Sequence, residues 1–157
     1  MTELIATYLQ DHHAGSSTGV DAFGRVAEYH SDERVRSAVG RIADEVEADQ
    51  QSLEQIMALV GAKTSTIKDV AGKVGEKVTR LKLNDRLTDR SPLSDVVELE
   101  ALVMAVHGKG LLWEALLELD DPRLDRAQLQ RLSDRAGSQR QELDHLRLTQ
   151  VHKLRQE

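Results

Sequence analysis

The residues most able to do chemistry in this 157-residue chain are histidines and carboxylates at helical spacing. Glu142 and His145 form an ExxH motif, and a spacing of three residues puts both side chains on one face of a helix. A carboxylate offers a divalent metal hard oxygen ligands, and an imidazole offers nitrogen. The full set of candidate metal ligands is His12, Glu45, Asp49, Glu100, His107, Glu142 and His145.

Several other chemistries are excluded by composition and charge. The chain has no cysteine, so disulfides, thiolate nucleophiles, zinc ribbons and iron-sulfur clusters are absent. It has no Ser-His-Asp set, and its glycine-rich stretch Gly72-Lys73-Val74-Gly75 does not follow a predicted strand, which argues against a nucleotide enzyme. A net charge of -6 disfavours nucleic acid as a partner, because phosphate binding needs a concentrated positive surface.

The overall composition predicts a single all-α domain spanning residues 1–157. Hydrophobic residues make up 39% of the chain, and the aromatic ones are one Phe, one Trp and two Tyr, so the core should be aliphatic. Two prolines and abundant Leu, Ala, Glu, Arg and Gln favour long helices. No apolar run approaches the roughly 20 residues that cross a bilayer, and the N-terminus lacks a basic segment followed by an apolar one. We therefore expect a cytoplasmic protein that does not bind membranes.

Capping signals divide the chain into four long helices and one long connection. Ser91-Pro92 is a helix N-cap followed by proline at the first helical position, and Asp121-Pro122 repeats the signal. The boundaries are expected at Glu3 and Tyr29 for the first helix, Ser31 and Gly61 for the second, Ser91 and Leu119 for the third, and Asp121 to a frayed tail at 152–157 for the fourth.

Each predicted helix has a stripe of residues at helical spacing that should face the core. The polar members of these stripes are His12 and Ser16 in the first helix, Asp49 in the second, Glu100 and His107 in the third, and Gln139 and Gln150 in the fourth. Other residues fall off the stripes or at helix ends: His13, His30 and His152 are expected at the surface, and Trp113 beneath the connection or in a dimer contact.

The connection 61–91 is too long for an ordinary loop and has its own apolar stripe from Ile67 to Leu81. It predicts an amphipathic crossover helix between two antiparallel hairpins. Eight Lys and Arg against four Asp and Glu give this segment a local charge of +4. We interpret that charge as a solvated helix face; a docking site for an acidic partner is the less favoured alternative.

The length, helix order, crossover and ExxH motif together resemble the ferritin-like superfamily. That resemblance implies a four-helix bundle with a di-iron or di-manganese centre, held by one Glu from each of two helices and an ExxH from each of the other two. The chain departs from this pattern in two helices. Ser16 stands at the centre of the first stripe where the family has a glutamate, and the third residue after Glu45 is Ala48, where a histidine would be needed.

The height of each candidate along the bundle is a further test, since a helix rises about 1.5 Å per residue. Ser16 and Glu45 both fall about 21 Å from the first inter-helix turn, and His12 and Asp49 about 27 Å. These two pairs are expected to be neighbours.

The candidates on the last two helices fit this level less well. His107 shares the height of Glu45, but Glu100 lies about 10 Å higher. Counting back from the last turn places Glu142 nearer Glu100, and Gln139 nearer Glu45. The pattern therefore predicts a lost or rearranged metal centre, in which Glu142 and His145 do not complete a site with Glu45.

Two functions remain open at this point. The first is a non-catalytic interaction or structural module, with the candidate ligands forming a buried polar network; the second is an iron- or manganese-dependent oxidase, oxygenase or iron-handling protein. Lys or Arg partners for the central carboxylates would favour the first, and carboxylates converging with histidine the second. We also expect a homodimer. Small-residue clusters at 14–19 and at Gly108 and Gly110 favour close helix approach or a seat for the crossover over a ligand cavity.

Overall fold

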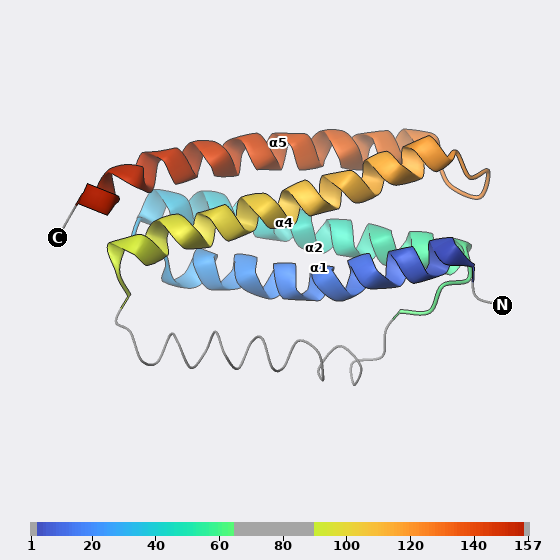
Figure 1. Cartoon of the computed structure of the whole chain (residues 1–157), viewed down its shortest axis with the longest axis horizontal. Helices are drawn as coiled ribbons and strands as arrows, with labels where there is room; N and C mark the ends of the chain where they lie inside the picture. Colours follow the sequence, from blue (N-terminus) through green and yellow to red (C-terminus); the bar gives the residue numbers. More distant parts are fainter. Residues whose placement is uncertain (1–2, 65–89, 156–157) are drawn as a thin grey trace.

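The computed structural model describes residues 3–64 and 90–155, which form an elongated bundle of α-helices (Figure 1). The helices of the described ranges are α1 (Leu4–Tyr29), α2 (Glu33–Leu59), α4 (Pro92–Leu119) and α5 (Arg126–Gln150), followed by the short 3-10 helix η1 (Val151–Arg155). These ranges contain no strand. The predicted all-α class is confirmed.

The four helices pack as two antiparallel pairs, α1 with α2 and α4 with α5 (Figure 1). At one end of the bundle, His30 Nε2 lies 3.1 Å from the backbone oxygen of Asp95, so the α1–α2 turn touches the first turn of α4. At the other end, Gln10 Nε2 donates to the Lys63 carbonyl at 3.0 Å, just beyond α2. Helices α2 and α4 therefore run parallel. The predicted crossover helix and most of its basic face, at 65–89, lie outside the described residues.

Helices α2, α4 and α5 begin at side-chain caps, and the cap predicted for α2 is wrong by a single residue. Ser91 caps α4 with Pro92 at the first helical position, as expected, and it also forms a capping box with Ser94. The N-cap of α2 is Asp32, whose carboxylate accepts from the Arg34 amide at 2.8 Å. Ser31, predicted for that role, instead donates its hydroxyl proton to the Asp95 carboxylate.

The start predicted for the fourth helix is also wrong, by about four residues. The Asp121 carboxylate accepts from the Arg123 amide at 2.9 Å and pairs with its guanidinium, which holds a turn in place of a helix. Asp125 then caps α5 by accepting from the amides of Ala127 and Gln128. At the end of α2, Gly61 has a φ of +70°, the left-handed conformation expected of a C′ glycine.

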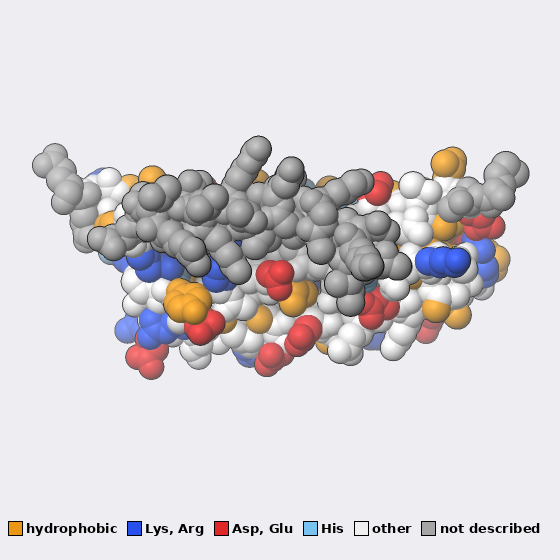
Figure 2. All heavy atoms as spheres, turned by 90° about the horizontal axis from the view of Figure 1, so that it is seen from below, with side chains coloured by type: hydrophobic (Ala, Val, Ile, Leu, Met, Phe, Trp, Pro, Cys, Tyr) orange, Lys and Arg blue, Asp and Glu red, His pale blue; other side chains and the backbone are white. Residues whose placement is uncertain are grey.

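The described surface mixes charges of both signs. On the face shown in Figure 2, visible acidic and basic side chains alternate along the bundle, with scattered hydrophobic ones between them. None of the described helices combines the length and apolar character needed to cross a membrane.

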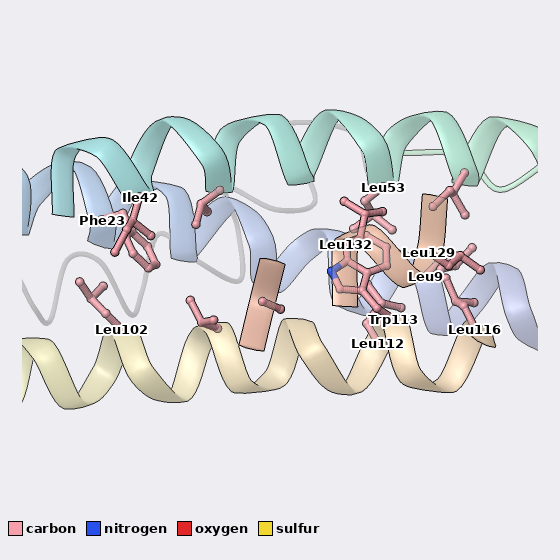
Figure 3. Packing of buried hydrophobic residues seen from close by; sticks show 14 of the residues in the cluster. Leu9, Phe23, Ile42, Leu53, Leu102, Leu112, Trp113, Leu116, Leu129 and Leu132 are labelled. Carbon is pink, nitrogen blue, oxygen red and sulfur yellow. The ribbon is translucent and has the colours of Figure 1, made fainter. Parts of the chain in front are cut away.

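The core is aliphatic with two aromatic side chains, Phe23 and Trp113 (Figure 3). The predicted stripes of α2 and α5 are largely confirmed, including the burial of their polar members Asp49 and Gln139. Trp113, expected off the main stripe, is 1% exposed in the core. It belongs to the same core cluster as Leu53, Leu112, Leu116, Leu129 and Leu132 (Figure 3).

The face of α4 predicted to point into the core is wrong, because the helix is rotated about its axis relative to that prediction. Glu100 and His107 are exposed, whereas Leu99, Leu102 and Val106 are buried. The cause is that α4 is apolar on more than one face: Val97, Met104 and Leu111 are also large hydrophobic residues, and they are exposed. A helix that is apolar nearly all round has no single stripe from which its orientation can be inferred.

Two histidines expected at the surface are buried. His13 Nε2 lies 3.0 Å from Glu54 Oε1, which links α1 to α2. His30 is 1% exposed and reaches Asp95 with the same atom. His152 is exposed, as predicted.

Asp95 joins three parts of the chain at one end of the bundle. It is 3% exposed, and its carboxylate accepts from Ser31, from Arg90 Nη2 at 2.8 Å and from Lys153 Nζ at 2.7 Å. Lys153 belongs to η1, so residues 152–155 of the predicted frayed tail form a 3-10 helix that contacts Asp95, and residues 156–157 lie outside the described residues. Burial alone raises the pKa of Asp95, but hydrogen bonds from Lys153, Ser31 and Arg90 outweigh it and leave that pKa well below its usual value.

Asp95→Asn should therefore lower the free energy of unfolding at pH 7 by about 2–3 kcal/mol, because two cations lose their common partner. A lowered pKa in the folded state stabilises the fold above the unfolded-state pKa of about 4, and this contribution is lost as the pH falls further. Urea unfolding between pH 7 and pH 2 should show the difference between the wild type and Asp95→Asn shrinking below about pH 4. The exposed Asp44→Asn on α2 is the control; an equal effect of both substitutions would contradict the role of Asp95.

Candidate functional site

An ion-pair network centred on a buried carboxylate occupies the middle of the bundle. Asp49 on α2 is 1% exposed, and its Oδ2 accepts from Lys109 Nζ of α4 at 2.5 Å. Its other oxygen, Oδ1, pairs with the guanidinium of Arg135 on α5. One carboxylate thus connects three helices through two cations.

Gln139 of α5 extends the network to a second carboxylate. Its Oε1 accepts from Lys109 Nζ at 2.5 Å, and its Nε2 donates to Glu45 Oε2 at 2.8 Å. Gln139 is itself buried, so both ends of its amide are satisfied within the bundle. We call these five residues the Asp49 network: Glu45, Asp49, Lys109, Arg135 and Gln139.

The charges around the network balance. Arg41 pairs with Glu142 on α5 and lies 3.6 Å from Glu45 one turn along α2, so three cations face three carboxylates across the two helix pairs. Burial lowers the pKa of Lys109, and the Asp49 carboxylate opposes that shift without cancelling it. A buried carboxylate that lost these partners would be strongly destabilising.

The predicted heights agree with part of this geometry. Gln139 reaches Glu45, as the counting along α5 indicated. Ser16, however, accepts from Gln50 Nε2 at 2.9 Å, and Gln50 lies five residues, about 7.5 Å, along α2 from the predicted neighbour Glu45, so that height is wrong by more than one turn. His12 and Asp49 line one cavity.

The remaining candidate ligands lie away from the centre. Glu142 is half-buried against Arg41, and Glu100 is exposed 3.7 Å from Arg147. His107 and His145 are exposed. His12 is partly buried, with its ring 4.8 Å from that of Tyr8, and burial lowers its pKa despite the opposing effect of Asp11.

The candidate residues do not fit a di-metal centre as they are arranged here. Within residues 3–64 and 90–155, no three His, Asp or Glu side chains come close enough together to hold a metal ion. The oxygens of Asp49, the most deeply placed carboxylate of the set, face an ammonium and a guanidinium. Both groups would repel a divalent cation.

Lys109 and Arg135 are the site residues that sequence reasoning missed. Lys109 lies between Gly108 and Gly110 on a helix whose inner face was assigned to other residues, and Arg135 is one of many charged residues on α5. A usable signal was present in α2, because Asp49 falls on the core stripe and a buried carboxylate requires a donor or a cation. Searching α4 and α5 for a cation at the height of Asp49 could have found both.

A cavity of about 180 Å³ lies beside the network, between α1, α2 and α4. Phe23, Val46, Leu53, Leu112 and Trp113 contribute apolar surface. The polar lining consists of His12, Ser16, Asp49, Gln50 and Lys109.

Comparisons of the chain with protein-family models, with curated proteins and with solved structures give no match. We therefore infer the function from the geometry and charge of this site.

The contributions of Lys109 and Asp49 to the free energy of unfolding should be strongly coupled. Lys109→Met is expected to lower the free energy of unfolding by about 2–4 kcal/mol, because Asp49 keeps Arg135 alone. In Lys109→Met/Asp49→Asn the loss should fall short of the sum of the two single losses by at least about 1 kcal/mol. Urea unfolding of the four proteins measures this difference.

The pair Lys109→Met and Asp95→Asn provides the control for that cycle. Asp95 has its own partners at the end of the bundle, so these two losses should add to within about 0.5 kcal/mol. Additive losses for Lys109 and Asp49 as well would show that their contact contributes little.

Proposed function

We propose that this chain is a non-catalytic interaction or structural module, built on a bundle of ferritin-like layout whose metal centre is lost or rearranged. The observation that carries the proposal is the contact of Lys109 Nζ with Asp49 Oδ2 at 2.5 Å, in the middle of the bundle. In the family that the chain resembles, carboxylates of the bundle centre bind metal. Here a cation of the chain itself binds the central carboxylate.

The proposal is also supported by the way such a network fixes the helices relative to one another. A polar network around a buried carboxylate favours one arrangement of its helices, since a shift that separates Asp49 from Lys109 and Arg135 leaves a buried charge unpaired. A rigid scaffold of fixed helix register presents a constant outer surface to a partner. The metal-dependent alternative, an iron or manganese oxidase, oxygenase or iron-handling protein, gains no supporting observation from the described residues.

Metal content tests the proposal directly. We expect less than about 0.1 iron or manganese per chain after purification without chelator or affinity metal, and no increase after anaerobic addition of ferrous iron, because the cations of the network exclude it. Elemental analysis of the purified protein gives the ratio. Near-stoichiometric metal that Glu45→Ala abolishes, and that the exposed Glu47→Ala retains, would support the metal-dependent alternative.

The surface of this module that best suits self-association is an exposed apolar row on α4. Val97, Met104 and Leu111 follow one another at seven-residue spacing, which places them along one side of the helix. The same row on a second copy would offer a matching apolar surface in a two-fold dimer. The homodimer expected from the sequence is proposed to use this row.

Leu111→Glu should then weaken the dimer at least tenfold, because it places a charge in the apolar contact. Sedimentation velocity over a range of concentrations measures the monomer-dimer equilibrium. Leu59→Glu is the matched control, since Leu59 is a similarly exposed leucine on α2, at 58% against 49% for Leu111. A chain that is monomeric throughout, or a dimer unaffected by Leu111→Glu, would contradict this interface.

A further inference from the structure

The cavity between α1, α2 and α4 opens at the seam between α1 and α4. Its exposed lining residues are Gly15 of α1 and Met104 and Ala105 of α4, whereas Phe23, Leu112 and Trp113 form its buried part. A small molecule could therefore enter between two helices and reach an apolar interior. Sites of this kind, between helices of a bundle, are common places for ligands.

Three glycines line the walls of the cavity. A Cβ atom added at Gly15, Gly19 or Gly108 would meet no heavy atom of the described residues within 4 Å. Close packing within the described ranges therefore does not require glycine at these positions, contrary to the close helix approach favoured from the sequence. Each glycine weakens its helix by about 0.5–1 kcal/mol relative to alanine. In the described structure each of these glycines faces open space and no close packing contact.

The Trp113 side chain points to what the space could hold. Trp113 is 1% exposed and lines the cavity, yet its indole Nε1–H has no hydrogen-bond partner among the described residues. In Figure 3 the ring nitrogen faces the middle of the bundle, on the side of Phe23 and away from Leu116. A buried donor left unpaired is costly, and almost all such donors in folded proteins are paired. An acceptor on a bound molecule would satisfy it.

The charges near the cavity favour a neutral ligand. The cations and carboxylates around the Asp49 network already balance, so an added charge would be buried without a counter-charge. Ser16 and Gln50, which also line the cavity, are already hydrogen-bonded to each other. Among the described side chains that line the cavity, the one buried group without a hydrogen-bond partner is thus the neutral Trp113 donor.

We propose that this cavity binds a small, neutral, mostly apolar molecule that carries a carbonyl group, and that the carbonyl oxygen accepts from Trp113 Nε1. A cavity of about 150 Å³ holds a benzene molecule, so about 180 Å³, open at the seam between α1 and α4, suits a benzene ring that carries a small carbonyl substituent. The inference goes beyond the proposed function, which assigns no ligand. It holds or fails whether or not the chain binds metal.

The test uses the full chain and the indole N–H signal in ¹H–¹⁵N correlation spectra, which is unique because the sequence contains one Trp. Acetophenone is the probe. It should shift this signal downfield in a saturable way, with a dissociation constant of about 0.1–1 mM. Cumene, which has the same shape without an acceptor, should bind about tenfold more weakly and cause no downfield shift. Benzoate should also bind at least about tenfold more weakly, because it adds a buried charge.

Variants place the probe within the cavity. Gly19→Leu should fill it and weaken acetophenone binding at least tenfold, whereas Gly24→Leu, at an α1 glycine outside the cavity, should leave binding unchanged. Trp113→Phe, followed by saturation-transfer signals of the ligand, should bind acetophenone no better than cumene; it gives a result even if Gly19→Leu does not fold. The absence of saturable binding, equal affinity for acetophenone and cumene, or binding insensitive to Gly19→Leu would each overturn the proposal.

Discussion

The pairing of the buried Asp49 carboxylate with Lys109 and Arg135 is the interaction on which the rest of the described structure depends. It brings charged groups from α2, α4 and α5 to one point between the two antiparallel hairpins, where α2 and α5 otherwise make few contacts. Burying a carboxylate is costly unless charges and hydrogen bonds compensate it, so these helices are constrained to the register in which both cations reach it. Gln139 reinforces that register by hydrogen bonding on both sides of its amide.

The same principle operates at the end of the bundle. Asp95 joins the α1–α2 turn, the start of α4 and the η1 helix through Ser31, Arg90 and Lys153. The described bundle is therefore fixed at two heights by two buried carboxylates, each with two cationic partners. Between these points the packing is aliphatic and much less specific in direction.

The sequence was informative where one face of a helix differs clearly from the others. On α2 and α5, charged outer faces leave a single apolar stripe, and the burial of Asp49 and Gln139 followed from it. On α4 the apolar residues are spread around the helix, so its orientation could not be inferred, and Glu100 and His107 were assigned to the core in error. The orientation of α4 is decided by tertiary contacts, among them Trp113 in the core and Lys109 on Asp49.

The candidate site shows the same division. The departure from a metal-binding pattern was visible in the sequence, because Ser16 and Ala48 stand where a glutamate and a histidine would be needed as ligands. The partners of the central carboxylate could not be recognised from the sequence, since Lys and Arg are common on helix surfaces. The burial of Lys109 follows from the way α4 packs beside α2. The small residues of α1 and α4 were likewise recognised as unusual, but whether they face a neighbour or open space depends on the packing of three helices.

The central claim is that cations of the chain, and not a metal ion, neutralise the carboxylates in the middle of the bundle. The most direct measurement is paramagnetic broadening of the Gln139 side-chain amide signal during titration with Mn²⁺, because this amide donates to Glu45 Oε2 at 2.8 Å. The account predicts that the Gln139 signal keeps its intensity at stoichiometric Mn²⁺. Selective loss of that signal at one or two equivalents would contradict the account, because it would place the metal among the carboxylates that Lys109 and Arg135 are claimed to neutralise.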